Sequence, residues 1–137
     1  AERMLKYAAE LGIDKQIIFT GWLSGENLRR AYYAASVVAV PSLYLDPFPT
    51  VTLEAMACHK PTVVTRLGGS PEAAEDGVTG YVVDPFDVDG MAGTIAGLLS
   101  DTEKNSAFGE AGYEKVKTDF SLEAQVKKYE TVFATAN

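Results

Sequence analysis

Residues 37–58 of this chain read VVAVPSLYLDPFPTVTLEAMAC. The first four residues form a continuous apolar run, which predicts a strand covered on both faces. A proline-rich loop follows, and a short apolar helix is expected to begin at Pro49 or Thr50 and to be buried. That helix contains Glu54, although a buried carboxylate needs hydrogen-bond partners or a proton. Asp46 lies eight positions earlier, in the loop, and the two isolated acids predict a pocket that binds the hydroxyl groups of a sugar.

Composition limits the chain to one domain with a hydrophobic core. Its 137 residues are 47% hydrophobic, which is enough for one core and too little for two domains. The net charge of −7 argues against binding of nucleic acid, because such binding requires a basic surface. The single cysteine, Cys58, excludes an internal disulfide and is expected to be a small core residue in a reducing compartment. We find no export signal or long apolar run, and therefore expect a cytoplasmic protein, peripheral to the membrane at most, without a transmembrane segment.

Short apolar strands alternate with helices along the chain. Strands are expected over residues 16–20, 37–40, 61–65 and 81–83. Helices are expected over residues 2–11, 24–35, 50–58, from 71, from a cap at Asp87 or Asp89 to 99, and over 102–117 and 121–134. This alternation predicts a doubly wound α/β fold with a parallel sheet, which binds ligands beyond the carboxyl ends of its strands. The loop of residues 41–50 lies at such an end.

Several short motifs follow one another in a characteristic order. They are Phe19-Thr20-Gly21, Leu28 with Tyr32, Pro41-Ser42, Asp46 seven residues before Leu53-Glu54-Ala55-Met56-Ala57, Pro61-Thr62-Val63-Val64, Gly68-Gly69-Ser70-Pro71-Glu72, and Gly77-Val78-Thr79-Gly80-Tyr81-Val82-Val83. Over residues 16–84 this order resembles the C-terminal, donor-binding domain of retaining GT-B glycosyltransferases with an acid-x7-Glu signature.

The resemblance implies a Rossmann-like doubly wound parallel sheet, the C-terminal half of a GT-B fold. Residues 1–120 would form a partial nucleotide-sugar-binding domain and residues 121–137 its C-terminal helix. In the family this domain begins with two strands that would precede residue 1, together with the arginine and lysine that bind the diphosphate. We therefore expect either an open sheet or a partner chain that completes it, such as a second copy in a homo-oligomer.

The resemblance also assigns roles to individual residues. Glu54 is implied to bind the ribose hydroxyls of a nucleoside diphosphate sugar, and Asp46 the hydroxyls of the transferred sugar. The backbone N–H groups of Phe48, Thr50 and Val51 are implied to meet the sugar and the distal phosphate, as a helix N-terminus favours anions.

Further residues border this predicted donor site. Trp22 and Leu23 match the loop beside the nucleotide base, although Trp22 would equally serve to cap the domain surface. The turn of residues 68–72 either borders the sugar or acceptor or is purely structural, and the role of Glu72 stays open. The lone histidine, His59, is expected to be a surface or capping residue. Three aromatics are expected to be core or rim residues: Tyr32, Tyr33 and Tyr44.

The implied reaction is transfer of a sugar from a nucleoside diphosphate donor to an acceptor with retention, without a metal or other cofactor. The acceptor site and the catalytic groups are expected in an N-terminal domain, and no catalytic residue is assigned in this chain. Two alternatives remain open. One is a non-catalytic module for nucleotide-sugar binding or assembly, and the other is a related nucleotide-sugar enzyme such as an epimerase.

Overall fold

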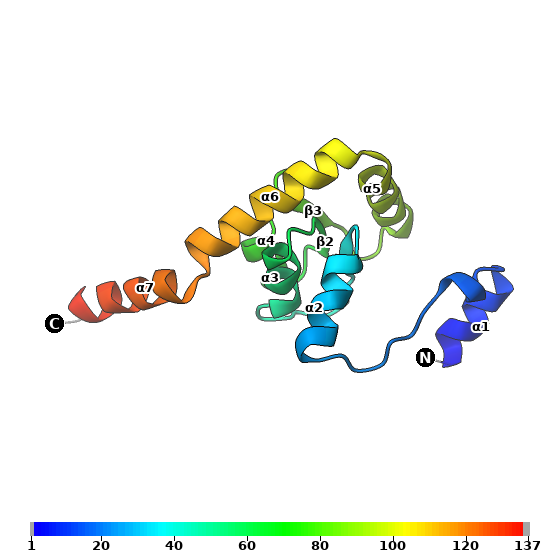
Figure 1. The fold of residues 1–137 in the computed structure, drawn as a ribbon, viewed down its shortest axis with the longest axis horizontal. Coiled ribbons are helices and arrows are strands. Elements are labelled where there is room, and N and C mark those ends of the chain that lie inside the picture. Colours follow the sequence, from blue (N-terminus) through cyan, green and yellow to red (C-terminus); the bar gives the residue numbers. More distant parts are fainter. Residues whose placement is uncertain (1, 136–137) are drawn as a thin grey trace.

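The computed structural model of this protein describes residues 2–135 (Figure 1). In chain order the elements are α1 (Glu2–Glu10), the 3-10 helix η1 (Asp14–Gln16), α2 (Gly25–Ala34), β1 (Val38–Val40), α3 (Thr50–Ala57), β2 (Thr62–Thr65), α4 (Ser70–Ala73), β3 (Gly80–Val83), α5 (Val88–Ser100), α6 (Thr102–Asp119) and α7 (Leu122–Thr135). Residues 1, 136 and 137, which the predicted domain bounds include, lie outside the described part. The bounds themselves stay a prediction.

The three strands form one parallel sheet in the order β1-β2-β3. Val38 lies opposite Thr62 in the first pair, and Thr62 lies opposite Gly80 in the second. The central strand β2 is buried along its whole length. Because all three strands run in the same direction, the loop after β1 and the turn after β2 meet at the same edge of the sheet. The predicted α/β architecture is confirmed.

The strand predicted over residues 16–20 does not form. Residue 16 ends η1 and the following residues pair with no strand of the described chain, so that Ile18 is 84% exposed. Apolar, β-branched residues favour extended backbone, but a strand also requires a neighbour for its N–H and C=O groups. Here the segment leads away from the sheet towards α1 (Figure 1).

The expectation for β1 is also partly wrong. Val38 and Val40 are half-buried but Ala39 is exposed, so this strand is not covered on both faces. Its position explains the difference, because β1 lies at an edge of the three-stranded sheet. The backbone on its outer side has no strand partner among residues 2–135.

The core lies between the sheet, α3 and α6. Met56 is fully buried, and Gly112 of α6 allows close contact because an added Cβ would lie 3.2 Å from the Met56 side chain. Gly109 of α6 lies directly against the carbonyl of His59, which follows α3 with a left-handed φ of 55°. The His59 ring stacks on Tyr113 at 4.0 Å, and its side chain is 46% exposed. This is the predicted position of His59 at the end of a helix.

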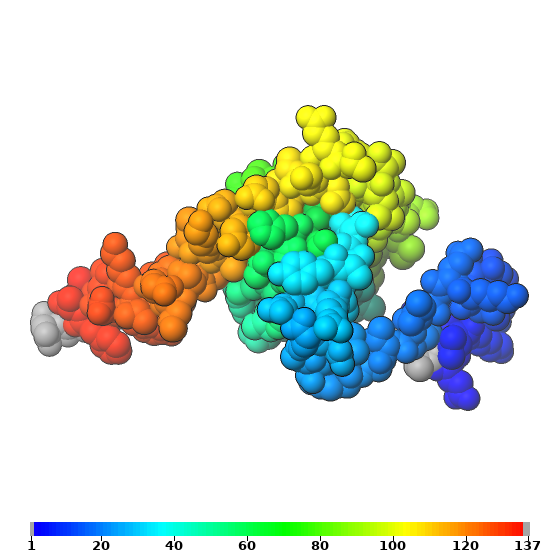
Figure 2. Space-filling model, viewed as in Figure 1, coloured from blue at the N-terminus to red at the C-terminus, as the bar shows by residue number. Residues whose placement is uncertain are grey.

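The two ends of the described chain extend away from this core. Figure 2 shows an elongated molecule, with the α1 region at one end and α7 at the other. None of the residues of α7 is buried. Within residues 2–135, every helix is too short or too polar to cross a bilayer.

Candidate functional site

The loop after β1 is held in place by Asp46. Its carboxylate Oδ1 accepts the Phe48 N–H at 3.1 Å, and its Oδ2 accepts the Tyr44 hydroxyl at 3.4 Å. Its backbone carbonyl accepts the N–H of Gly69, from the turn after β2, at 2.8 Å. Thr65 at the end of β2 adds a hydrogen bond from its hydroxyl to the Ser42 carbonyl at 2.8 Å. The predicted sugar-binding acid is therefore fixed at the carboxyl edge of the sheet.

Helix α3 begins directly after this loop and has no side-chain cap. Pro49 is its N-cap, and the Thr52 N–H donates to the Pro49 carbonyl at 3.0 Å. The N–H groups of Thr50 and Val51 find no acceptor in the described chain. Thr50 is exposed and Val51 is 42% exposed, so an anion has access to both. The helix dipole adds to the attraction of these N–H groups for negative charge.

The backbone N–H of Phe48 is not free to bind a ligand, contrary to the prediction. Its N–H, expected to meet the ligand, instead donates to Asp46, and its ring packs 5.6 Å from the ring of Phe120. An aspartate two residues before an N–H commonly forms this Asx turn, which competes with any external acceptor. Of the three backbone N–H groups assigned from the sequence, those of Thr50 and Val51 are free.

Glu54 is exposed, so the expectation of a buried carboxylate is wrong. Thr52, Ala55 and Met56 form the buried face of α3, and Glu54 projects from a different face. Its Oε2 accepts a hydrogen bond of 2.9 Å from the Tyr32 hydroxyl of α2.

Glu54 is one of the residues that line a largely apolar cleft of about 250 Å³ between α2 and α3. The cleft is lined from α2 by Gly25, Leu28, Arg29 and Tyr32, and from α3 and its C-cap by Glu54, Ala57 and Cys58. Asp46 lies in the loop before α3, and Glu54 lies in α3 itself. The Glu54 carboxylate accepts the Tyr32 hydroxyl, whereas the Asp46 carboxylate accepts the Tyr44 hydroxyl.

The electrostatics of the cleft keep both neighbours of Glu54 protonated. Burial, the hydrogen bond to Glu54 and the charge of Glu54 raise the pKa of Tyr32 to about 12. Burial also raises the pKa of the Cys58 thiol, against the opposing effect of Lys60 and Arg29. A protonated thiol is a poor nucleophile. Cys58 is half-buried at the cleft, however, and is not the core residue that was predicted.

Two basic residues lie next to β2, at opposite ends. Lys60 precedes the strand, and its Nζ donates to the Tyr33 carbonyl at 3.0 Å. Arg66 follows the strand at the carboxyl edge of the sheet, where it pairs with Asp84 at 3.2 Å. Only Arg66 lies at the same edge as the loop of Asp46, and its guanidinium is already paired.

The loop residues assigned to the nucleotide base are not packed around the cleft. Trp22 is 94% exposed and Leu23 is half-buried, and neither lines the cleft that contains Glu54. The surface-capping role considered for Trp22 is not seen either, because a side chain so exposed covers little of the domain. Their assignment to the base stays a prediction.

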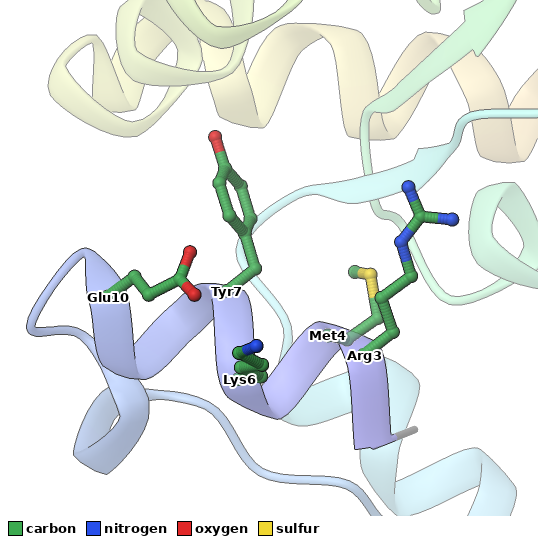
Figure 3. A pocket seen from close by; sticks show the side chains of 5 residues that line it. All are labelled: Arg3, Met4, Lys6, Tyr7 and Glu10. Carbon is green, nitrogen blue, oxygen red and sulfur yellow. The ribbon is translucent and has the colours of Figure 1, made fainter.

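A further cavity lies away from all of these residues. It measures about 510 Å³ and is lined by Arg3, Met4, Lys6, Tyr7 and Glu10 (Figure 3). All five side chains come from α1, with Arg3, Met4 and Tyr7 pointing to the same side of the helix. A space bordered by a single helix brings no groups from different elements together, so we place the candidate site at the carboxyl edge of the sheet instead.

Two tyrosines form contacts that were not predicted from the sequence. Tyr32 and Tyr44 were expected to be core or rim aromatics, yet their hydroxyls donate to Glu54 and Asp46. Tyr44 is two residues from Asp46, a spacing that suits a local hydrogen bond. Tyr32 is 22 residues from Glu54, and its contact depends on how α2 packs on α3.

Among residues 2–135 we find no group of three or more His, Cys, Asp or Glu placed to hold a metal ion.

Comparison with known proteins identifies the family to which this chain belongs. A family model described as glycosyl transferases group 1 matches residues 1–115. The chain belongs to this family. Among group 1 relatives, D-inositol 3-phosphate glycosyltransferase of Mycobacterium sp. (strain KMS) is 46% identical over 99 residues, which are 72% of this chain and 22% of that protein.

Solved structures of glycosyltransferases agree with this fold. Anabaena HepE in complex with UDP-glucose matches with a TM-score of 0.86 at 25% identity, over 97% of this chain and 36% of that one. The C-terminal domain of the group 1 protein LpcC from Francisella tularensis matches with a TM-score of 0.78 at 30% identity, over 88% of this chain and 62% of that one. The predicted resemblance to a GT-B C-terminal domain is confirmed, and the chain spans roughly a fifth to a third of the curated group 1 relatives it matches.

Proposed function

We propose that this chain is the donor-binding part of a retaining glycosyltransferase, which transfers a sugar from a nucleoside diphosphate sugar to an acceptor. The observation that carries the proposal is the uncapped start of α3, where the free N–H groups of Thr50 and Val51 follow directly on the loop of Asp46. The N–H groups suit a phosphate, and the two carboxylates suit hydroxyl groups. HepE, a structural neighbour, was crystallised with UDP-glucose, which supports this class of ligand.

In this proposal each group has one task. The N-terminus of α3 stabilises charge on the departing diphosphate, and the Asp46 carboxylate orients the transferred sugar. Glu54 accepts hydroxyl groups of the ribose. No metal is required, and an N-terminal domain outside this chain supplies the acceptor site. Chelation by EDTA should therefore leave donor binding unchanged, and a loss of binding that Mg²⁺ restores would contradict this part.

A backbone substitution tests the role of α3. Thr50 is the first residue of the helix, where proline fits, and Pro49 already has the extended backbone (φ −75°, ψ 101°) that a following proline requires. Thr50→Pro therefore deletes the N–H without breaking the helix. The control is Thr50→Ala, which removes the same side chain and keeps the N–H.

Isothermal titration calorimetry of this chain with UDP-glucose, GDP-mannose and ADP-glucose gives the readout. Thr50→Pro should weaken the best of these ligands by about 10- to 100-fold, as expected for a hydrogen bond to a charged group, while Thr50→Ala stays near wild type. Equal affinities for the two variants would overturn the proposed function.

A second candidate function is assembly without catalysis. It is favoured by the open edge of β1 and by the exposed Ile18 and Trp22. A second copy that pairs along β1 would produce a dimer in solution, measurable by light scattering coupled to size exclusion. The Val38 N–H already donates to the Pro61 carbonyl at 3.1 Å, so the N–H that faces the open side is that of Ala39. Ala39→Pro should then return the chain to a monomer, and a wild-type chain that is already monomeric would exclude pairing of this kind.

A further inference from the structure

We propose that Tyr32 is a positioning residue, whose hydroxyl holds one carboxylate oxygen of Glu54 and leaves the other free for a hydroxyl of the donor's pentose. The inference deepens the proposed function and rests on it. It assigns a role to a residue of α2, an element that contributes no group to the donor contacts derived above.

The geometry is that of a strong hydrogen bond between two elements. The Tyr32 hydroxyl and Glu54 Oε2 are 2.9 Å apart, within the normal range for an O–H donor. Tyr32 is half-buried and has a ring with only two side-chain torsions, whereas Glu54 is exposed and has a flexible side chain. The tyrosine is therefore the fixed partner, and it restricts the orientation of the carboxylate.

The second carboxylate oxygen of Glu54 indicates which kind of ligand this residue binds. Oε1 forms no hydrogen bond with any residue of the described chain. An ionised carboxylate only accepts hydrogen bonds, so this exposed oxygen is available to a donor such as a sugar hydroxyl. Because Tyr32 supplies a neutral donor, the negative charge of Glu54 is retained for that contact.

Arg29, the cation that lines the cleft, does not take the place of Tyr32 as the partner of Glu54. Arg29 lies one turn before Tyr32 on α2, but its guanidinium pairs with Glu26 at 2.7 Å. A bidentate arginine would occupy both oxygens of Glu54 and leave neither free for a ligand. Because Arg29 pairs with Glu26, it does not occupy the carboxylate oxygens of Glu54.

A double-mutant cycle tests the inference on this chain. The probes are UDP and GDP, each compared with its 2′,3′-dideoxy analogue, and the variants are Tyr32→Phe, Glu54→Gln and both together. Tyr33→Phe is the matched control, because Tyr33 is the neighbouring tyrosine on α2 and its hydroxyl makes no hydrogen bond within residues 2–135. Affinities come from isothermal titration calorimetry.

Tyr32→Phe should weaken binding of the preferred ribonucleotide by about two- to tenfold and leave the dideoxy analogue unaffected. The substitution should add nothing when Glu54→Gln is already present, and Tyr33→Phe should resemble wild type. Equal weakening of both nucleotides by Tyr32→Phe, or no weakening, would overturn the positioning role.

Failure of the proposed function gives a different pattern. If Glu54→Gln weakens ribonucleotide and dideoxy analogue equally, Glu54 is not the pentose ligand. If no nucleotide binds to this chain, titration of the Tyr32 phenol by its ultraviolet absorbance decides whether the contact with Glu54 exists. The groups around that phenol are Glu54 of α3, Cys58 at the C-cap of α3 and Arg29 of α2. A Tyr32 pKa that Glu54→Gln does not lower would show that the hydrogen bond is absent in solution.

Discussion

The close contact between the two loops at the carboxyl edge of the sheet makes Gly69→Ala an informative substitution. Gly69 donates its N–H to the Asp46 carbonyl at 2.8 Å and has a φ of −84°, which alanine adopts without strain. Any effect of the substitution therefore comes from the added methyl group. We expect that methyl group to push the loop of Asp46 away from the turn after β2.

The magnitude follows from the distances. An added Cβ would come closest to the carbonyl oxygen of Pro47, and it would lie 3.0 Å from the carbonyl carbon of that residue and 3.2 Å from the Cα of Phe48. Carbon atoms prefer separations of about 3.5–4.0 Å and the oxygen is closer still, so the two loops must separate by at least about 1 Å. Backbone atoms cannot give way as a flexible side chain can, and overpacking of this kind costs about 1–3 kcal/mol. The same movement displaces the start of α3 and should weaken donor binding.

Urea unfolding followed by circular dichroism measures this cost as a decrease in the free energy of unfolding. The control is Gly93→Ala on α5, where an added Cβ meets no atom within 4 Å. Alanine in a helix interior is preferred over glycine, so this variant should be stabilised by about 0.5–1 kcal/mol. A Gly69→Ala variant as stable as wild type, or a Gly93→Ala variant destabilised to the same extent, would refute the reasoning.

Three further predictions concern the core, the cleft and the surface. Met56→Ala removes a fully buried side chain from between α3 and α6 and should lower the free energy of unfolding by about 2–5 kcal/mol in urea; a loss under about 1 kcal/mol would contradict this packing. Because folding raises the pKa of Tyr32 from near 10 to about 12, the stability that its phenol contributes should be complete below about pH 10 and lost as the pH rises through about 12. In Tyr32→Phe the free energy of unfolding, measured between pH 9 and 12, should lack this pH-dependent contribution. Identical pH profiles for wild type and Tyr32→Phe would disprove the prediction. Glu110→Gln removes the charge from a hydrogen-bonded contact with His59 whose side chains are 63% and 46% exposed, so it should change the stability by less than about 1 kcal/mol in thermal unfolding.

Much of the fold could be predicted because its signals are local. The start of α3 after Pro49 and the cap of α5 by Asp87, which accepts the Gly90 N–H at 2.9 Å, follow from residues a few positions apart. The strand predicted over residues 16–20 has the right residue types and still fails, because a strand also depends on a neighbour that no local pattern specifies.

The candidate site was predicted less completely. Asp46, Thr50 and Val51 lie where the motif order placed them, at the carboxyl edge of the sheet. The predicted burial of Glu54 was wrong because the apolar neighbours of a helical residue do not determine which face of the helix packs. Phe48 was assigned to the ligand, and the local hydrogen bond from its N–H to Asp46 was overlooked.

The sequence by itself determined that this is a parallel α/β domain with a strand, an acid-bearing loop and a short helix as its central unit. Residue preferences, prolines and helix caps act over a few positions and are sufficient for that. Only the tertiary structure decided that Glu54 turns towards Tyr32 and that Gly69 lies against the loop of Asp46. Those contacts join residues 22 and 23 positions apart, and packing of whole elements sets their direction, which no short stretch of chain encodes.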